Sequence, residues 1–214
     1  MRNQAGWNCP LLRREGWGGA LVDQVPFTRL KVIVPLGWCC LLVGCGGDVP
    51  TTPQGRLDAA SNKIATASSE EDKFDALDDA AKESFEVGQV ENARKYANDL
   101  LALAPKYKDD WNYGNAIQDG NLVLGRIALR DGHTEEAKQY LLAAGRSPGS
   151  PQMDSFGPNM SLAKDLLEKG EHKVVLQYFE LCRVFWKDDY GKLTQWSSDV
   201  MAGTIPDFGA NLIY

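Results

Sequence analysis

The stretch QDGNLVLGRIALRDGHTEEAKQYLLAA, residues 118–144, contains two amphipathic segments separated by one glycine. In the first segment Leu124 and Ala128 recur at helical spacing, and Gly132 follows as a residue that tolerates positive φ. Thr134 is suited to cap a second helix whose first turn carries two glutamates. The stretch therefore predicts a helical hairpin with one buried face, and that face needs a stacked partner.

Two further stretches align with this hairpin on their glycines. They are FDALDDAAKESFEVGQVENARKYANDLLALAP, residues 74–105, and FGPNMSLAKDLLEKGEHKVVLQYFELCRVFW, residues 156–186. Before the aligned Gly88, Gly132 and Gly170 stand Ala80-Ala81, Leu124-Gly125 and Leu162-Ala163, and eight residues after them stand Tyr96, Tyr140 and Tyr178. The alignment predicts three hairpins of the same design, separated by insertions at 106–117 and 146–155.

This pattern resembles the tetratricopeptide repeat, a helical hairpin of about 34 residues with Leu-Gly in its first helix, Ala in its second and a closing Pro. Leu124-Gly125 and Ala137 match the signature, as do Ala93 and Pro105 in the first unit. The signature Trp is replaced by Leu77, Asn121 and Asn159, and Val175 stands where Ala is usual. Over residues 73–186 the resemblance implies an all-α array of about three hairpins.

One more amphipathic helix is predicted within residues 189–203, where Tyr190, Leu193, Trp196 and Val200 fall on one face. It would cover the open face of the last hairpin, as terminal repeats do. The tail 207–214 ends in apolar residues that either pack on the stack or form a partner site, and we favour packing.

The N-terminal part reads as a secretory signal. A short basic segment precedes an apolar run of 12 residues, 32–43, which is too short to span a bilayer, since a spanning helix needs about 20 residues. The following Leu42-Val43-Gly44-Cys45 resembles the lipobox of bacterial lipoproteins, which implies a diacylglyceryl group on Cys45. Gly46 in the next position favours the outer membrane. A start at Val25 rather than Met1 is an alternative.

These features divide the chain into three parts. Residues 1–44 are an extension and lipoprotein signal peptide, residues 45–72 are the lipidated cysteine and a flexible tether, and residues 73–214 are the helical-hairpin domain. A short helix over 57–67 is an alternative within the tether. Ser69 and Asp72 have the spacing of a capping box, which marks the start of the domain.

The composition gives little support for catalysis or nucleic-acid binding. The chain has 23 basic and 29 acidic side chains, a net charge of −6, and five cysteines without metal-ligand spacing. His133 and His172 fall at hairpin turns, and Cys182 reads as a small buried residue. We therefore expect no enzyme activity, no metal and no cofactor.

A basic column is the candidate binding surface. In tetratricopeptide stacks the residue after the small Ala or Gly faces the concave groove, and here those residues are Lys82, Arg126 and Lys164, with Arg130 one turn beyond Arg126. Residues 45–214 carry 18 basic and 27 acidic side chains, a net charge of −9. The column predicts a groove for a carboxylate-bearing peptide or protein segment. The alternative is that these side chains only solvate an exposed face.

The whole sequence predicts a membrane-anchored, tetratricopeptide-like lipoprotein that acts as a protein-interaction scaffold in the bacterial cell envelope. We expect its partners to be a protein or peptide and, through the lipid, the membrane, with no nucleic acid. Two alternatives remain at this point: an envelope hydrolase with an unrecognised site, and a structural spacer between envelope layers.

Overall fold

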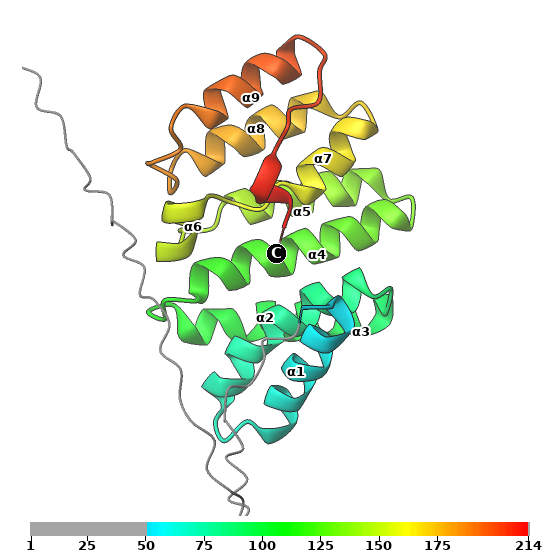
Figure 1. The fold of residues 1–214 in the computed structure, drawn as a ribbon, viewed down its shortest axis with the longest axis vertical. Helices are drawn as coiled ribbons and strands as arrows, with labels where there is room; N and C mark the ends of the chain where they lie inside the picture. Colours follow the sequence, from blue (N-terminus) through cyan, green and yellow to red (C-terminus); the bar gives the residue numbers. More distant parts are fainter. Residues whose placement is uncertain (1–50, 214) are drawn as a thin grey trace, which may run out of the picture. The chain divides into compact units, whose positions relative to one another are not determined.

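The computed structural model describes residues 51–213, which are all-helical and contain no strand, so the predicted all-α class is confirmed. The helices lie one after another along the long axis of this region (Figure 1). Their bounds are α1 Pro53–Thr66, α2 Glu70–Glu86, α3 Val90–Leu103, α4 Tyr113–Arg130, α5 Thr134–Gly145, α6 Pro151–Phe156, α7 Ser161–Glu168, α8 His172–Cys182 and α9 Lys192–Met201, with short 3₁₀ turns η1 Ala104–Tyr107 and η2 Gly209–Leu212.

Three hairpins form where the aligned glycines predict them: α2 with α3, α4 with α5, and α7 with α8. Gly88, Gly132 and Gly170 take φ values of +79°, +85° and +82°, a region in which residues with a Cβ are strained. The predicted cap at Thr134 is wrong. His133 occupies the N-cap position, and no side chain caps α5.

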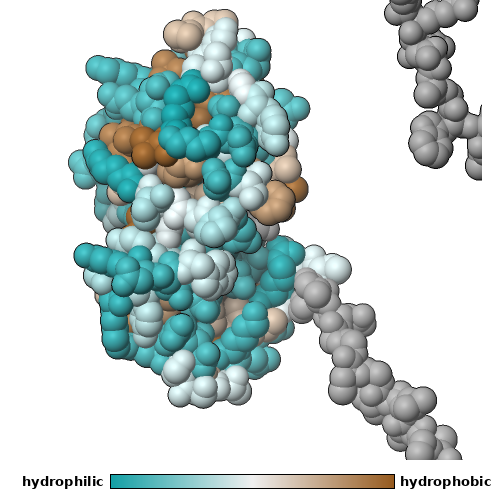
Figure 2. All heavy atoms as spheres, turned by 90° about the vertical axis from the view of Figure 1, so that its left-hand side faces the viewer, coloured by the Kyte–Doolittle hydropathy of each residue, from teal (hydrophilic) through white to brown (hydrophobic). Residues whose placement is uncertain are grey.

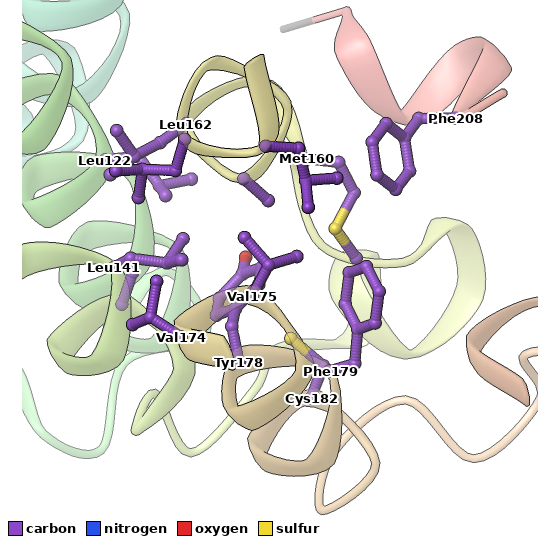
Figure 3. Close-up of a cluster of buried hydrophobic side chains, with 14 of the residues drawn as sticks. Leu122, Leu141, Met160, Leu162, Val174, Val175, Tyr178, Phe179, Cys182 and Phe208 are labelled. Carbon is purple, nitrogen blue, oxygen red and sulfur yellow. The ribbon is translucent and has the colours of Figure 1, made fainter. Parts of the chain in front are cut away.

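The hairpins stack through their second helices. α3 packs on α4, α8 packs on α9, and α5 contacts α8 more extensively than it contacts α7. α5 approaches α8 closely at Gly145, where a Cβ would lie 2.9 Å from Cδ2 of Tyr178. Figure 3 shows the core of this C-terminal half, where Leu141, Leu162, Tyr178 and Phe179 converge from three helices. The third hairpin is therefore seated on α5 mainly through its second helix.

Residues 53–66 are not a tether, and this part of the predicted 45–72 segment is corrected. They form α1, which packs on α2 with Leu57 buried and with Arg56 Nε 2.5 Å from Glu83 Oε1. Thr52 caps the helix by accepting a hydrogen bond from Gly55 N. The capping box of Ser69 and Asp72 is confirmed, but it begins the second helix of the folded region rather than the first.

Both insertions contain helix. The first carries η1 and the opening turn of α4, so α4 begins at Tyr113, five residues before the predicted hairpin at Gln118. The second carries α6, which Ser150 caps by accepting a hydrogen bond from Met153 N. α6 lies beside the N-terminal half of α4 and helps to form the site described below.

The C-terminal helix forms as predicted, with Leu193, Trp196 and Val200 buried. The prediction that Tyr190 lies on the buried face of this helix is wrong. Tyr190 precedes α9, has left-handed backbone angles and is 89% exposed. The tail packs back on the stack: the Phe208 ring lies 5.0 Å from the Trp196 ring, and Asn211 O accepts a hydrogen bond from Met160 N at 2.7 Å. The favoured alternative for the tail is confirmed at these positions.

Gly125 gives a test of the stack. A Cβ at this position would lie 2.3 Å from Leu162 Cδ2 and 3.0 Å from Tyr140 Cβ, although the equivalent Ala81 and Ala163 are accommodated in their own hairpins. We expect Gly125→Ala to lower the free energy of unfolding by about 1–2 kcal/mol, because overpacking outweighs the gain in helix propensity. Chemical denaturation measures the change.

A double-mutant cycle supplies the control for this prediction. Truncating the clashing side chain by Leu162→Ala should make Gly125→Ala less destabilising than it is in the wild-type background. Equal effects in the two backgrounds, or a stabilised Gly125→Ala, would contradict the packing described for α4 and α7.

Candidate functional site

The first helices of the three hairpins, α2, α4 and α7, form one face of the stack. α4 contacts both α2 and α7, so it lies between them. Arg126 of α4 reaches both neighbours, because its Nη1 lies 2.8 Å from Glu86 Oε1 on α2 and its Nε lies 3.0 Å from Asp165 Oδ2 on α7. Its guanidinium also stacks 4.4 Å from the centroid of the Phe85 ring. Arg126 is therefore a brace between hairpins.

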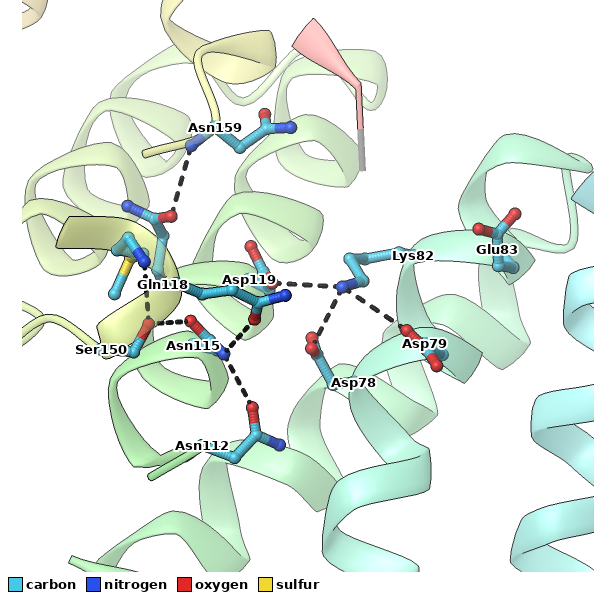
Figure 4. A network of polar contacts seen from close by, with 12 residues as sticks. Asp78, Asp79, Lys82, Glu83, Asn112, Asn115, Gln118, Asp119, Ser150 and Asn159 are labelled. Carbon is cyan, nitrogen blue, oxygen red and sulfur yellow. Dashed lines mark hydrogen bonds and ion pairs between the residues drawn. The ribbon is translucent and has the colours of Figure 1, made fainter. Parts of the chain in front are cut away.

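Lys82 is also committed to the protein itself. Its ammonium lies 3.1 Å from Asp78, 3.7 Å from Asp79 and 3.3 Å from Asp119, and its side chain is 12% exposed. Figure 4 shows the three carboxylates converging on this one nitrogen. Lys164 pairs with Glu168 at 3.6 Å, while Arg130 is exposed and makes no ion pair with any residue of the described part.

The predicted basic ladder is therefore not an open cationic surface. The structure brings Lys82, Arg126 and Lys164 to one face, but each is already matched. Three basic side chains meet six acidic ones, namely Asp78, Asp79, Asp119, Glu86, Asp165 and Glu168, so the local balance is −3. Lys82, Arg126 and Lys164 lie on the predicted face, but acids from neighbouring turns and helices reverse the sign of its charge.

Burial changes the acid–base chemistry around Lys82. Burial raises the pKa of Asp119 to about 7. The Lys82 ammonium lowers this pKa, and the nearby Asp78 carboxylate raises it again. For Lys82, burial alone would lower the pKa, but the charges of Asp78, Asp119 and Asp79 hold it well above the ordinary value. The Asp78 Oδ1 atom is buried and has no hydrogen-bond partner among the described residues.

A pocket of about 560 Å³ opens above this cluster. Its lining includes Asp78 and Lys82 of α2, Asp119 of α4, residues of α6 and of the loop that follows it, Lys192 of α9 and the C-terminal tail. Two exposed apolar side chains stand at the pocket, Phe156 at 74% and Ile213 at 75% exposure. Its volume falls within the range typical of ligand sites.

Amide side chains hold the walls of the pocket together. Asn115 Nδ2 donates to Asn112 Oδ1 and to Gln152 Oε1, each at 3.0 Å, which ties α4 to α6. Gln118 Nε2 donates to Tyr178 Oη. Gln118 Oε1 accepts from Asn159 N (Figure 4). Because these groups are bonded to the protein, they fix the shape of the pocket and leave its charge to the aspartates and lysines that line it.

The sequence contained a signal for this pocket that the repeat alignment missed. Asn115, Gln118 and Asp119 have the i, i+3, i+4 spacing of one helical face. The repeat alignment places Asn115 in the insertion 106–117, outside the predicted hairpin, whereas it belongs to α4. The contribution of α6 and the tail could not be found from spacing, since both reach the pocket by tertiary packing.

Comparison with family models gave no match to this chain, and comparisons with curated proteins and with solved structures gave none either.

Within residues 51–213 no group of three His, Cys, Asp or Glu side chains is placed to hold a metal ion. Burial raises the pKa of the Cys182 thiol, which lies in the core. In the same range no helix has the length and apolar character needed to cross a bilayer. Cys45 lies outside the described residues.

Asp119 predicts a defined pH dependence of stability. A carboxyl whose pKa rises from 3.8 to about 7 on folding stabilises the folded state in full below pH 3.8, and this contribution is lost as the pH rises to about 7. One such group changes the unfolding free energy by at most about 1.4 kcal/mol per pH unit. Denaturation of wild type and Asp119→Asn across this window should show the wild type losing stability relative to the variant, and a constant difference would contradict the assignment.

Proposed function

We propose that this chain is a tetratricopeptide-like lipoprotein of the bacterial cell envelope that binds a segment of a partner protein on its first-helix face. The observation that carries the proposal is the 560 Å³ pocket on that face, with exposed Phe156 and Ile213 beside it. Exposed apolar side chains next to a preformed pocket are typical of protein-binding sites. The three glycine-turned hairpins support the repeat assignment, and the seating of α8 on α5 is a departure from a regular array.

The exposed apolar residues also favour a partner site in the C-terminal half of the described region. Among the described residues, the large exposed hydrophobic side chains after α5 are Phe156, Val184, Tyr190, Met201, Ile205 and Ile213, whereas only Trp111 precedes it. Figure 2 shows hydrophobic surface gathered mainly in the upper half of the face that it displays, the half that carries α8 and α9. A partner segment that contacts the C-terminal half would cover part of this surface.

The rival functions make different predictions. An envelope hydrolase could use a carboxylate as its base or nucleophile, but the two carboxylates that line the pocket, Asp78 and Asp119, are both paired with the ammonium of Lys82. A structural spacer needs no pocket and would tolerate its loss. The prediction of a carboxylate-bearing partner is also weakened, because Lys82 and Arg126 already pair with acids of this chain.

Site-specific photo-crosslinking tests the binding surface in the envelope. A benzophenone amino acid replaces Phe156, which is 74% exposed and lines the pocket, and Trp111, which is 58% exposed, precedes α5 and does not line the pocket, serves as the control. We expect a discrete crosslinked product from position 156 and none at the same size from position 111. Identical products from both positions, or none from position 156, would contradict a partner site at the pocket.

The anchor has its own test. If Cys45 carries the lipid, Cys45→Ala should abolish incorporation of radiolabelled palmitate and release the chain from the membrane fraction. Cys182→Ala is a suitable control, because that thiol is buried in the core. Label retained in Cys45→Ala would rule out this cysteine as the acylation site.

A further inference from the structure

The loop between α6 and α7 forms part of the pocket wall, and side chains from distant parts of the chain set its conformation. Gly157, Pro158 and Asn159 of this loop line the pocket. Tyr178 Oη donates a hydrogen bond to Asn159 O at 2.9 Å, and Gln118 Oε1 accepts one from Asn159 N at 3.3 Å. These bonds attach the end of the loop to α8 and α4, whereas the start of the loop is held by a different element.

That element is the C-terminal tail, residues 207–213, which binds the loop through Asn211. The Asn211 Nδ2 atom donates to Phe156 O and to Pro158 O, each at 3.0 Å. Its main-chain O accepts from Met160 N at 2.7 Å. Because Asn211 is buried, water competes poorly for these bonds. One residue of the tail therefore binds the loop on both sides of its glycine and fixes its path.

Gly157 leaves the space into which the Asn211 side chain fits. Its φ is +87°, and a Cβ at this position would lie 2.7 Å from Asn211 Nδ2 and 2.5 Å from Trp186 Cζ2. A residue with a Cβ would displace the tail or the Trp186 ring, and it would also be strained in this backbone region. The loop and the tail are therefore fitted to each other at this point.

The tail has an apolar anchor away from the pocket. The Phe208 ring packs against the rings of Trp196 and Phe179, with centroid distances of 5.0 Å and 6.1 Å. Trp196 Nε1 also donates to Asp207 O at 3.2 Å. Phe208 is buried and does not line the pocket, whereas later residues of the same tail do. The tail is therefore anchored on α8 and α9 and contributes part of the pocket wall a few residues further on.

We propose that the tail is a clasp whose docking forms the partner site, with Asn211 as its positioning residue. The docked tail completes the pocket wall and fixes the loop, and release of the tail removes both. The proposal rests on the proposed function and adds that partner binding is lost when the tail is released from a chain whose hairpins stay folded. Release breaks the bonds of Asn211 and the packing of Phe208 but none of the apolar packing among α2, α3 and α4, so it needs less free energy than global unfolding.

Native-state hydrogen exchange of the purified full-length protein measures release of the clasp. At low urea concentrations we expect the Met160 amide, which is bonded to the tail, to exchange through a local opening that depends little on urea. Val123 in the middle of α4 should exchange through global unfolding with the full urea dependence. The same opening free energy and urea dependence at both amides would overturn the proposal, because the tail would then leave only when the whole fold is lost.

The variant Asn211→Asp tests the positioning residue. It keeps the shape of the side chain, removes both N–H donors and places a carboxylate beside two carbonyl oxygens. We expect the protection factor of the Met160 amide to fall by about tenfold or more, as for the loss of two buried hydrogen bonds. Asn98→Asp is the matched control, because Asn98 Nδ2 also donates to a carbonyl, Arg94 O, but on the exposed face of α3.

The control should change the protection of Met160 by less than about twofold. Unchanged protection of Met160 in Asn211→Asp would also overturn the proposal.

Photo-crosslinking from position 156 connects the clasp to the function. The double variant Phe208→Ala, Asn211→Asp removes both the apolar anchor and the polar bonds, so Met160 should lose its protection while Val123 keeps enough to show that the hairpins are folded. In this variant we expect the crosslinked product to be lost, because only the docked fraction binds, and in Asn98→Asp we expect it to remain.

The outcomes separate the clasp from the function on which it rests. A product that persists at position 156 although Met160 is unprotected would leave the binding function standing and overturn the clasp. No product from position 156 in the chain with an otherwise unchanged sequence would remove the binding function itself, and the clasp would lose its role with it.

Discussion

One ammonium shared by three carboxylates decides the chemistry of the first-helix face. Lys82 and two of its acids come from adjacent turns of α2, and Asp119 comes from α4, so the cluster joins the first two hairpins. A lysine at this level of burial stays charged only because several negative groups surround it. Two of these acids, Asp78 and Asp119, together with Lys82 also line the neighbouring pocket, so the cluster forms part of its wall.

Arg126 continues the arrangement along the stack. Its guanidinium joins α2, α4 and α7 through Glu86 and Asp165, so each first helix is tied to the next by a charged contact. The pairs are partly exposed, and each one stabilises the fold only modestly. Their main effect is to hold α2, α4 and α7 together as one surface, with the apolar clusters behind it.

The local parts of this fold could be read from the sequence. The glycine turns, the buried Ala and Leu positions and the helix around Trp196 follow from helical spacing and from the need for positive φ. The short helix offered as an alternative at 57–67 forms, but it begins earlier, at Pro53, where Thr52-Pro53 is a recognisable helix start and few large apolar residues follow to mark its buried face. Tyr190 was misplaced because spacing alone cannot show that a helix begins at Lys192.

The site was only half predictable for a physical reason. The position of Lys82 and Arg126 on the first-helix face follows from their register, but the fate of their charges depends on Asp119 and Asp165, which are 37 and 39 residues away in the chain. Pairing over such distances depends on how the hairpins stack. The register of the helices therefore indicates the face, and the packing of α2, α4 and α7 decides that its basic side chains pair with acids of the same chain.

The most direct measurement is the pKa of Asp119 itself, followed through its side-chain carboxyl carbon by NMR as the pH is varied. If Asp119 is buried beside Asp78 and the Lys82 ammonium, its carboxyl titrates near pH 7. A titration at the ordinary value of 3.8 would contradict the account, because Asp119 would then be solvated or fully neutralised by Lys82.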